Sequence, residues 1–180
     1  MQTEHEPIPK GSTPPARASG VDPLSEIDDL MDKKRLEEEE AAKRSDQLEV
    51  DRSDFAREFT RVCDEQARPA MEAVLERLRR NGGGGLMDER PENARQHHTH
   101  RLTLWMSFRG EITGAPRQDR HPYLQLDADV DKRTVAVSEG DMWQGEGGSR
   151  SGKTAEWQLA DVTFAHVTQE VLGIVRRALK

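Results

Sequence analysis

The uneven distribution of apolar residues limits where this chain can form a core. Most residues before Asp51 are charged or polar, whereas the apolar side chains are concentrated after it. Over all 180 residues, 33% are hydrophobic and 34% are charged. A chain of this polarity folds only where its apolar residues are gathered in one region. The sequence therefore predicts a single folded domain over residues 51–180 behind a polar N-terminal segment.

The N-terminal segment divides into two parts. Residues 1–23 are rich in proline, glycine, serine and threonine and carry few large apolar side chains, so we expect a disordered tail. Residues 24–50, hereafter the arm, are highly charged and are expected to be partly helical. The apolar residues at the start of the arm lie at helical spacing; they are Leu24, Ile27, Leu30 and Met31.

This apolar stripe is the candidate partner-binding element of the chain. A short amphipathic helix of this kind can fold against a groove on another protein. Two alternatives remain: the arm is a partly helical spacer, or it packs weakly on its own domain.

Two segments of the folded region show the periodicity of helices. Residues 51–80 predict a long helix with Ser53 as its N-cap and an interruption near Ala67 and Arg68, because Pro69 lacks a backbone donor. The glycines at 82–85 are expected to end this helix as a flexible hinge. A second helix is predicted after Thr163. Its core-facing stripe consists of Phe164, Val167, Val171, Ile174, Val175 and Ala178.

Between these helices the period changes to two, as in strands. Residues 101–108 and 123–130 alternate apolar and polar side chains, and residues 134–138 are expected to pair with 123–130 in an antiparallel hairpin. Residues 155–159 suggest a fourth strand. The predicted fold class is α+β: a long N-terminal helix, a three- to four-stranded antiparallel sheet and a C-terminal helix packed on one face, preceded by a disordered or helical charged tail.

A glycine-rich segment matches the phosphate-binding pattern of P-loop proteins. In residues 147–154, GGSRSGKT, the nucleotide-contacting positions would be Gly147, Gly152, Lys153 and Thr154. That loop needs a strand before it and a helix directly after it. Here the residues after Thr154 alternate as a strand does, so a small nucleotide-binding regulator or enzyme is an alternative function rather than the leading one.

Histidine and tryptophan residues supply two further candidate sites. His98 and His100 are two residues apart and would share one face of a strand, where both could ligate a metal. A metal-binding protein is therefore a second alternative, although the sequence identifies no third ligand. Trp105 and Trp157 are expected on strands, where they either line a pocket or serve as packing anchors.

Charge and composition restrict the class of partner. A net charge of −7 disfavours binding to nucleic acid and to anionic membrane surfaces. The single cysteine, Cys63, and the absence of a signal-peptide pattern lead us to expect a cytoplasmic protein. No cofactor is expected, and no arrangement of residues points clearly to an enzyme.

The leading interpretation is a non-enzymatic protein-interaction module. The order of helix, sheet and helix, together with the acidic balance, is similar to that of small bacterial secretion chaperones and adaptor modules, in layout alone. That layout implies an adaptor or chaperone-like role with another protein as partner. An exposed strand edge would also allow a homodimer.

Overall fold

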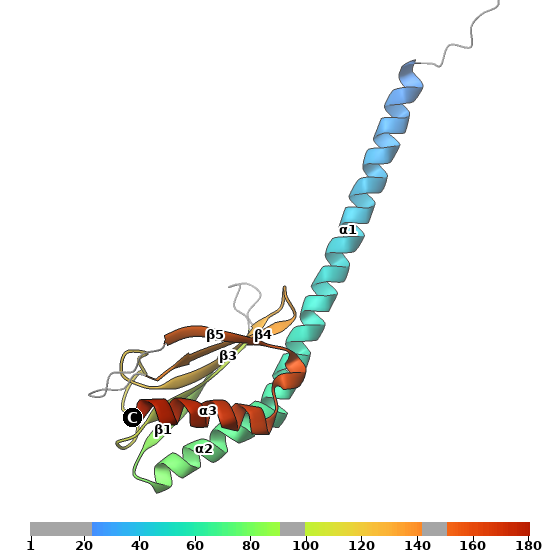
Figure 1. Ribbon diagram of the computed structural model, residues 1–180. Helices are drawn as coiled ribbons and strands as arrows, with labels where there is room; N and C mark the ends of the chain where they lie inside the picture. Colours follow the sequence, from blue (N-terminus) through green and yellow to red (C-terminus); the bar gives the residue numbers. More distant parts are fainter. Residues whose placement is uncertain (1–22, 91–99, 142–150) are drawn as a thin grey trace, which may run out of the picture. The chain divides into compact units, whose positions relative to one another are not determined.

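A computed structural model describes residues 23–90, 100–141 and 151–180 of the chain (Figure 1). The predicted disordered tail lies, apart from Pro23, outside these residues. The chain divides into two compact units, Met1–Ser45 and Asp46–Lys180. The elements, in chain order, are helix α1 (Pro23–Val62), π-helix η1 (Cys63–Ala67), helix α2 (Arg68–Arg80), strands β1 (Gly84–Arg90), β2 (Arg101–Ser107), β3 (Tyr123–Asp129), β4 (Thr134–Gly140) and β5 (Ser151–Trp157), 3₁₀-helix η3 (Leu159–Asp161) and helix α3 (Phe164–Ala178).

The α+β class is confirmed, with five strands rather than three to four. The sheet is antiparallel throughout and its strands follow in chain order, β1-β2-β3-β4-β5. The predicted hairpin is present as β3 and β4, in which Leu126 pairs with Val137. The expected strand near residues 155–159 is present as β5, which begins and ends earlier, at Ser151 and Trp157.

The strand that the sequence did not predict is β1, and the prediction of a flexible hinge at residues 82–85 was wrong. Gly84 and Gly85 pair with Ser107 and Met106 of β2. Gly85 has φ +154°, and a Cβ atom on it would lie 2.2 Å from the carbonyl oxygen of Trp105. Glycine is therefore needed here because two backbones approach closely, not because the chain bends freely.

The first helix begins earlier than predicted, since Ser53 lies inside α1 rather than at its N-cap. The predicted interruption before Pro69 takes the form of the π-helix η1. At its end the backbone N–H of Arg68 donates to the carbonyl oxygen of Cys63, five residues earlier. Pro69 then lies in the first turn of α2, where a missing backbone donor is tolerated.

The core of the Asp46–Lys180 unit lies between one face of the sheet and the helices (Figure 1). Leu102, Leu104 and Met106 of β2 are fully buried on this face. In α3 the hydroxyl of Thr163 accepts a hydrogen bond from the His166 backbone at 3.2 Å, as the predicted N-cap requires. Phe164 departs from the predicted core stripe, because its side chain is 44% exposed.

Among the described residues, no helix combines the length and the apolar character that crossing a membrane requires. Although α1 has 40 residues, charged side chains are spread along it.

We predict that Gly85→Ala destabilises the folded unit more than Gly82→Ala does. Both positions have positive φ, and nothing lies within 4 Å of a Cβ atom on Gly82. Gly82→Ala should therefore cost about 1–2 kcal/mol of unfolding free energy. Gly85→Ala should cost about 1–3 kcal/mol more, because the new methyl group meets the Trp105 carbonyl. Urea denaturation of both variants measures the difference, and equal losses would contradict the close approach of β1 to β2.

Candidate functional site

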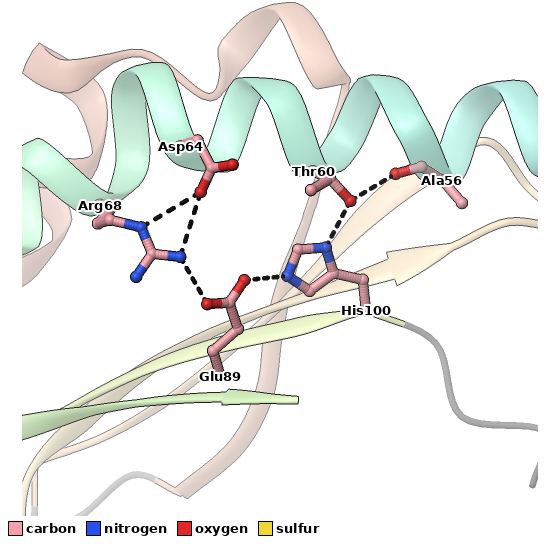
Figure 2. Close-up of polar contacts among 6 residues, drawn as sticks. All are labelled: Ala56, Thr60, Asp64, Arg68, Glu89 and His100. Carbon is pink, nitrogen blue, oxygen red and sulfur yellow. Dashed lines mark hydrogen bonds and ion pairs between the residues drawn. The ribbon is translucent and has the colours of Figure 1, made fainter. Parts of the chain in front are cut away.

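A polar cluster on the helix-covered side of the sheet is centred on His100, just before β2. Its side chain is only 3% exposed. Nδ1 of the ring lies 2.7 Å from the hydroxyl oxygen of Thr60 on α1, and Nε2 lies 2.9 Å from a carboxylate oxygen of Glu89 on β1 (Figure 2). The imidazole therefore connects a helix to the edge strand of the sheet.

The local sequence explains this meeting of three elements. Glu89 pairs with Leu102 across the β1–β2 ladder, which places it two residues from His100 on the same face of the sheet. On α1, Thr60 follows the buried Phe59, whose ring meets His100 edge-on with centroids 5.3 Å apart. Phe59 thus fixes the distance between α1 and the ring, and Thr60 supplies the polar contact.

The Thr60 hydroxyl has two partners. It lies 3.0 Å from the Ala56 carbonyl oxygen, to which it donates, and it also contacts Nδ1 of His100. Donor and acceptor roles at the two ring nitrogens follow the tautomer of the imidazole.

Glu89 also links the cluster to an arginine. Nη2 of Arg68 lies 2.6 Å from the second carboxylate oxygen of Glu89 and 3.1 Å from Asp64 (Figure 2). The hydrogen bond from Arg68 is the main reason why the pKa of Glu89 is lowered, with His100 contributing less. The same bond raises the pKa of the Arg68 side chain.

The contacts link Thr60, His100 and Glu89 in the order of a nucleophile, a base and an orienting acid. The geometry of these contacts nevertheless supports a structural role. The hydroxyl proton is directed at the Ala56 carbonyl, and both ring nitrogens already have partners. With 3% of its surface exposed, His100 offers no face to a substrate. The cluster connects α1 to β1 and β2.

Cys63 lies on the same helical face and is also buried. Burial, and then the charges of Asp64 and Glu89, raise the pKa of its thiol to about 12. A thiol of this kind is almost entirely protonated near neutral pH and makes a poor nucleophile.

Of the two predicted metal ligands, the structure describes His100 alone. His98 lies outside the described residues, and His100 contacts Thr60 and Glu89 as given above. Within residues 23–90, 100–141 and 151–180, no group of three histidine, cysteine or acidic side chains has the arrangement of a metal site.

The glycine-rich segment is partly described. Gly147 lies outside the described residues, whereas Gly152, Lys153 and Thr154 lie within β5, an edge strand of the antiparallel sheet. Lys153 pairs with Glu156 of the same strand, with 3.0 Å between Nζ and Oε2. The next α-helix begins only at Phe164. Lys153 and Thr154 are therefore extended chain, and no helix starts at them to direct backbone N–H groups at a phosphate.

The two tryptophans lie on opposite faces of the sheet. Trp157 belongs to the core between sheet and helices, where it stacks on His166 with ring centroids 4.2 Å apart. Trp105 lies between the core residues Leu104 and Met106 of β2, so its side chain is on the other face of the sheet. Its ring contacts that of Tyr123, with centroids 5.0 Å apart. The sheet separates them, so they do not line one pocket.

The four residues of the predicted partner-binding stripe are all exposed on α1. Leu24, Ile27, Leu30 and Met31 expose 66%, 55%, 60% and 63% of their surfaces. The arm also exposes Leu36, Leu48 and Val50. Burial of the apolar residues of α1 begins only at Phe55.

Sequence reasoning missed a buried ion cluster at the other end of the sheet. Arg177 of α3 lies 2.7 Å from Glu139 of β4 and 3.2 Å from Asp141, and both carboxylates are buried. The alternation of β4 could have located this cluster, because Glu139 lies two residues after Val137 and therefore on the same face as the core residues Val135 and Val137.

We expect Thr60→Val to destabilise the protein by about 1–3 kcal/mol, because it leaves the buried His100 ring without its hydroxyl partner. Thr168→Val is the matched control. The Thr168 hydroxyl also bonds the carbonyl four residues earlier, that of Phe164, but it is exposed. Its replacement should change the unfolding free energy by less than about 0.5 kcal/mol. Equal effects in guanidinium denaturation would show that the Thr60–His100 contact contributes nothing.

Glu89 should make stability dependent on pH. A lowered carboxyl pKa stabilises the folded state above the unfolded value of 4.5, and this contribution is lost as the pH falls through the folded value. Glu89→Gln should therefore reduce the difference in unfolding free energy between about pH 7 and about pH 3, by about 1 kcal/mol or less because the side chain is partly exposed. Glu72→Gln, at an exposed position on α2, is the control; an equal reduction there would contradict the assignment.

Comparison with known proteins was made for the whole chain. It matches no protein family, no curated protein and no solved structure.

Proposed function

We propose that the chain is a non-enzymatic protein-interaction module, of adaptor or chaperone-like type, whose arm docks onto another protein. The observation that supports this proposal is the exposed stripe of Leu24, Ile27, Leu30 and Met31. Single exposed apolar side chains are common on protein surfaces, whereas four within eight residues on a helix are typical of an interaction surface. Anchors at this spacing fit the mode in which an amphipathic helix lies in a groove.

The charges of the arm explain how the stripe can be presented on a helix. Five ion pairs at i,i+3 or i,i+4 spacing occur among its described residues: Lys33–Glu37, Lys34–Glu38, Arg35–Asp32, Arg35–Glu39 and Arg44–Glu40. Each such exposed pair stabilises a helix by about 0.3–0.5 kcal/mol. Together they favour the helical form in a segment with few apolar residues, and a helix that is already formed loses less entropy on binding.

The chemistry of the folded unit also favours binding over catalysis. The Thr60 hydroxyl and both nitrogens of His100 are engaged within the protein, and the thiol of Cys63 is protonated and buried. These side chains are among the strongest nucleophile and base candidates in the described residues, and each has a structural partner or is inaccessible.

The test compares tagged full-length chains as baits in extracts of the native cell. In the arm variant, Leu24, Ile27, Leu30 and Met31 are replaced by serine. In the control, four other exposed apolar residues are replaced by serine: Leu36, Phe164, Leu172 and Leu179. Proteins that co-purify with the wild-type chain should be retained by the control and reduced about tenfold or more by the arm variant, since anchor residues dominate binding.

Circular dichroism should confirm that both variants remain folded. Equal retention of every partner by the arm variant would contradict the proposal and identify the arm as a spacer. Loss of the partners from the control alone would move the interaction surface to α3, where three of the control residues lie in or beside the helix.

A further inference from the structure

Three of the four apolar residues at the start of the arm, Leu24, Ile27 and Met31, belong to a longer regular pattern on α1. Positions 24, 27, 31, 34, 38, 41, 45 and 48 follow one another at alternating steps of three and four residues. This is the spacing at which one face of a helix meets a second helix in a coiled coil. The face carries Leu24, Ile27 and Met31 at one end, Ala41, Ser45 and Leu48 at the other, and Lys34 and Glu38 between them.

The pattern is symmetric about residue 36. If a second, identical helix is placed antiparallel with residue 36 opposite residue 36, position 24 faces 48, 27 faces 45, 31 faces 41 and 34 faces 38. Leu24 then meets Leu48, a pair of equal size, whereas Met31 meets Ala41, a large side chain opposite a small one. Every position of the series meets another position of the same series.

The charges of the arm favour this orientation. In the antiparallel arrangement Lys34 of one copy faces Glu38 of the other, twice about the two-fold axis. In a parallel pair Glu38 would meet Glu38 and Lys34 would meet Lys34.

We propose, building on the function above, that the partner of the arm is a second copy of this chain, bound antiparallel with Lys34 of each copy facing Glu38 of the other. An isologous contact of this kind is self-complementary and closes as a dimer. The charged centre sets the orientation, and the apolar ends supply most of the affinity.

The exposure of Lys34 and Glu38 agrees with a surface that a second helix can cover. Lys34 and Glu38 expose about the same fraction of their side chains, 70% and 69%, and pair with each other at 3.8 Å within one helix. In the dimer the two lysines and two glutamates form one group of alternating charge, so the pair within each helix is kept while a second partner is gained.

The decisive experiment is sedimentation equilibrium of full-length chains carrying reversed charges. Lys34→Glu gives a chain with two acidic side chains at the centre of the face, and Glu38→Lys gives a chain with two basic ones. Each variant alone should self-associate at least about tenfold more weakly than the wild-type chain, because like charges meet across the axis. An equimolar mixture of the two should regain a dimer, since each acidic position now faces a basic one.

The mixture separates this proposal from an effect on the helix itself. Both single variants lose the Lys34–Glu38 pair within the helix, so fraying would weaken the mixture as much as either variant alone. A wild-type chain that stays monomeric at every concentration, variants that dimerise as well as the wild type, or a mixture that stays monomeric would each overturn the proposal.

Cross-linking tests the orientation independently. Met31→Cys and Ala41→Cys chains should form a disulfide with each other on mixing and not with themselves, because in the antiparallel pair residue 31 lies about 15 Å along the axis from residue 31 of the second copy. The native Cys63 is buried and does not interfere. Self-linking of the Met31→Cys chain would indicate a parallel pair and overturn the proposal.

An experiment that rules out self-pairing of the arm is distinguishable from one that rules out its binding to any partner. The Lys34→Glu chain keeps Leu24, Ile27, Leu30 and Met31 unchanged. A chain that binds another protein through this stripe, and does not bind itself, overturns only the self-pairing. If replacing Leu24, Ile27, Leu30 and Met31 by serine weakens neither self-association nor the binding of another protein, both the self-pairing and the proposed function are overturned.

Discussion

The folded unit depends on covering one apolar face of an antiparallel sheet. Leu104 and Leu124 lie at the centre of that face, fully buried, and Phe59, Met71 and Ile174 approach them from the helical layer. Each buried side chain of this size contributes roughly 1.5–3 kcal/mol through the apolar area removed from water. The helices α2 and α3, together with the C-terminal part of α1, are positioned by this requirement. The polar contacts described above adjust an arrangement that apolar burial imposes.

Polar side chains link the helices to the sheet at two places and set orientation more than stability. His100 and Glu89 link α1 to β1 at one edge, while Arg177 links α3 to the carboxylates of Glu139 and Asp141 at the end of β4. Ion pairs taken out of water lose much of their attraction to desolvation, so a well-packed apolar substitute is often as stable. Their directional hydrogen bonds select one register of helix against sheet.

Much of the fold followed from periodicity alone. The alternation in β2, in the β3–β4 hairpin and in β5, and the stripe of α3 after the Thr163 cap, were sufficient to predict those elements. Strand β1 was missed because its first two residues are glycines and its last three are charged, so that no alternation is visible. The arm was predicted to be partly helical, but its continuity with the helix after Asp51 was missed because Ser53 was expected to cap a new helix.

The sites were predicted less well, since they depend on register. His100 was noted as a metal ligand, but its contacts with Thr60 and Glu89 follow only from the pairing of β1 with β2. Trp105 and Trp157 were placed on strands correctly. They lie on opposite faces because the β4–β5 register shifts by a bulge between Val137 and Ser138, and no sequence pattern predicted this bulge.

If α1 pairs as proposed, its apolar stripe is completed by a contact between molecules. Hydrogen exchange measured over a range of protein concentration tests it most directly, because an unpaired helix of this kind is only marginally stable in water. We expect the amides of residues 27–45 to become more protected as the concentration rises, while those of β3 stay equally protected throughout. Exchange of residues 27–45 that does not change with concentration would contradict the pairing.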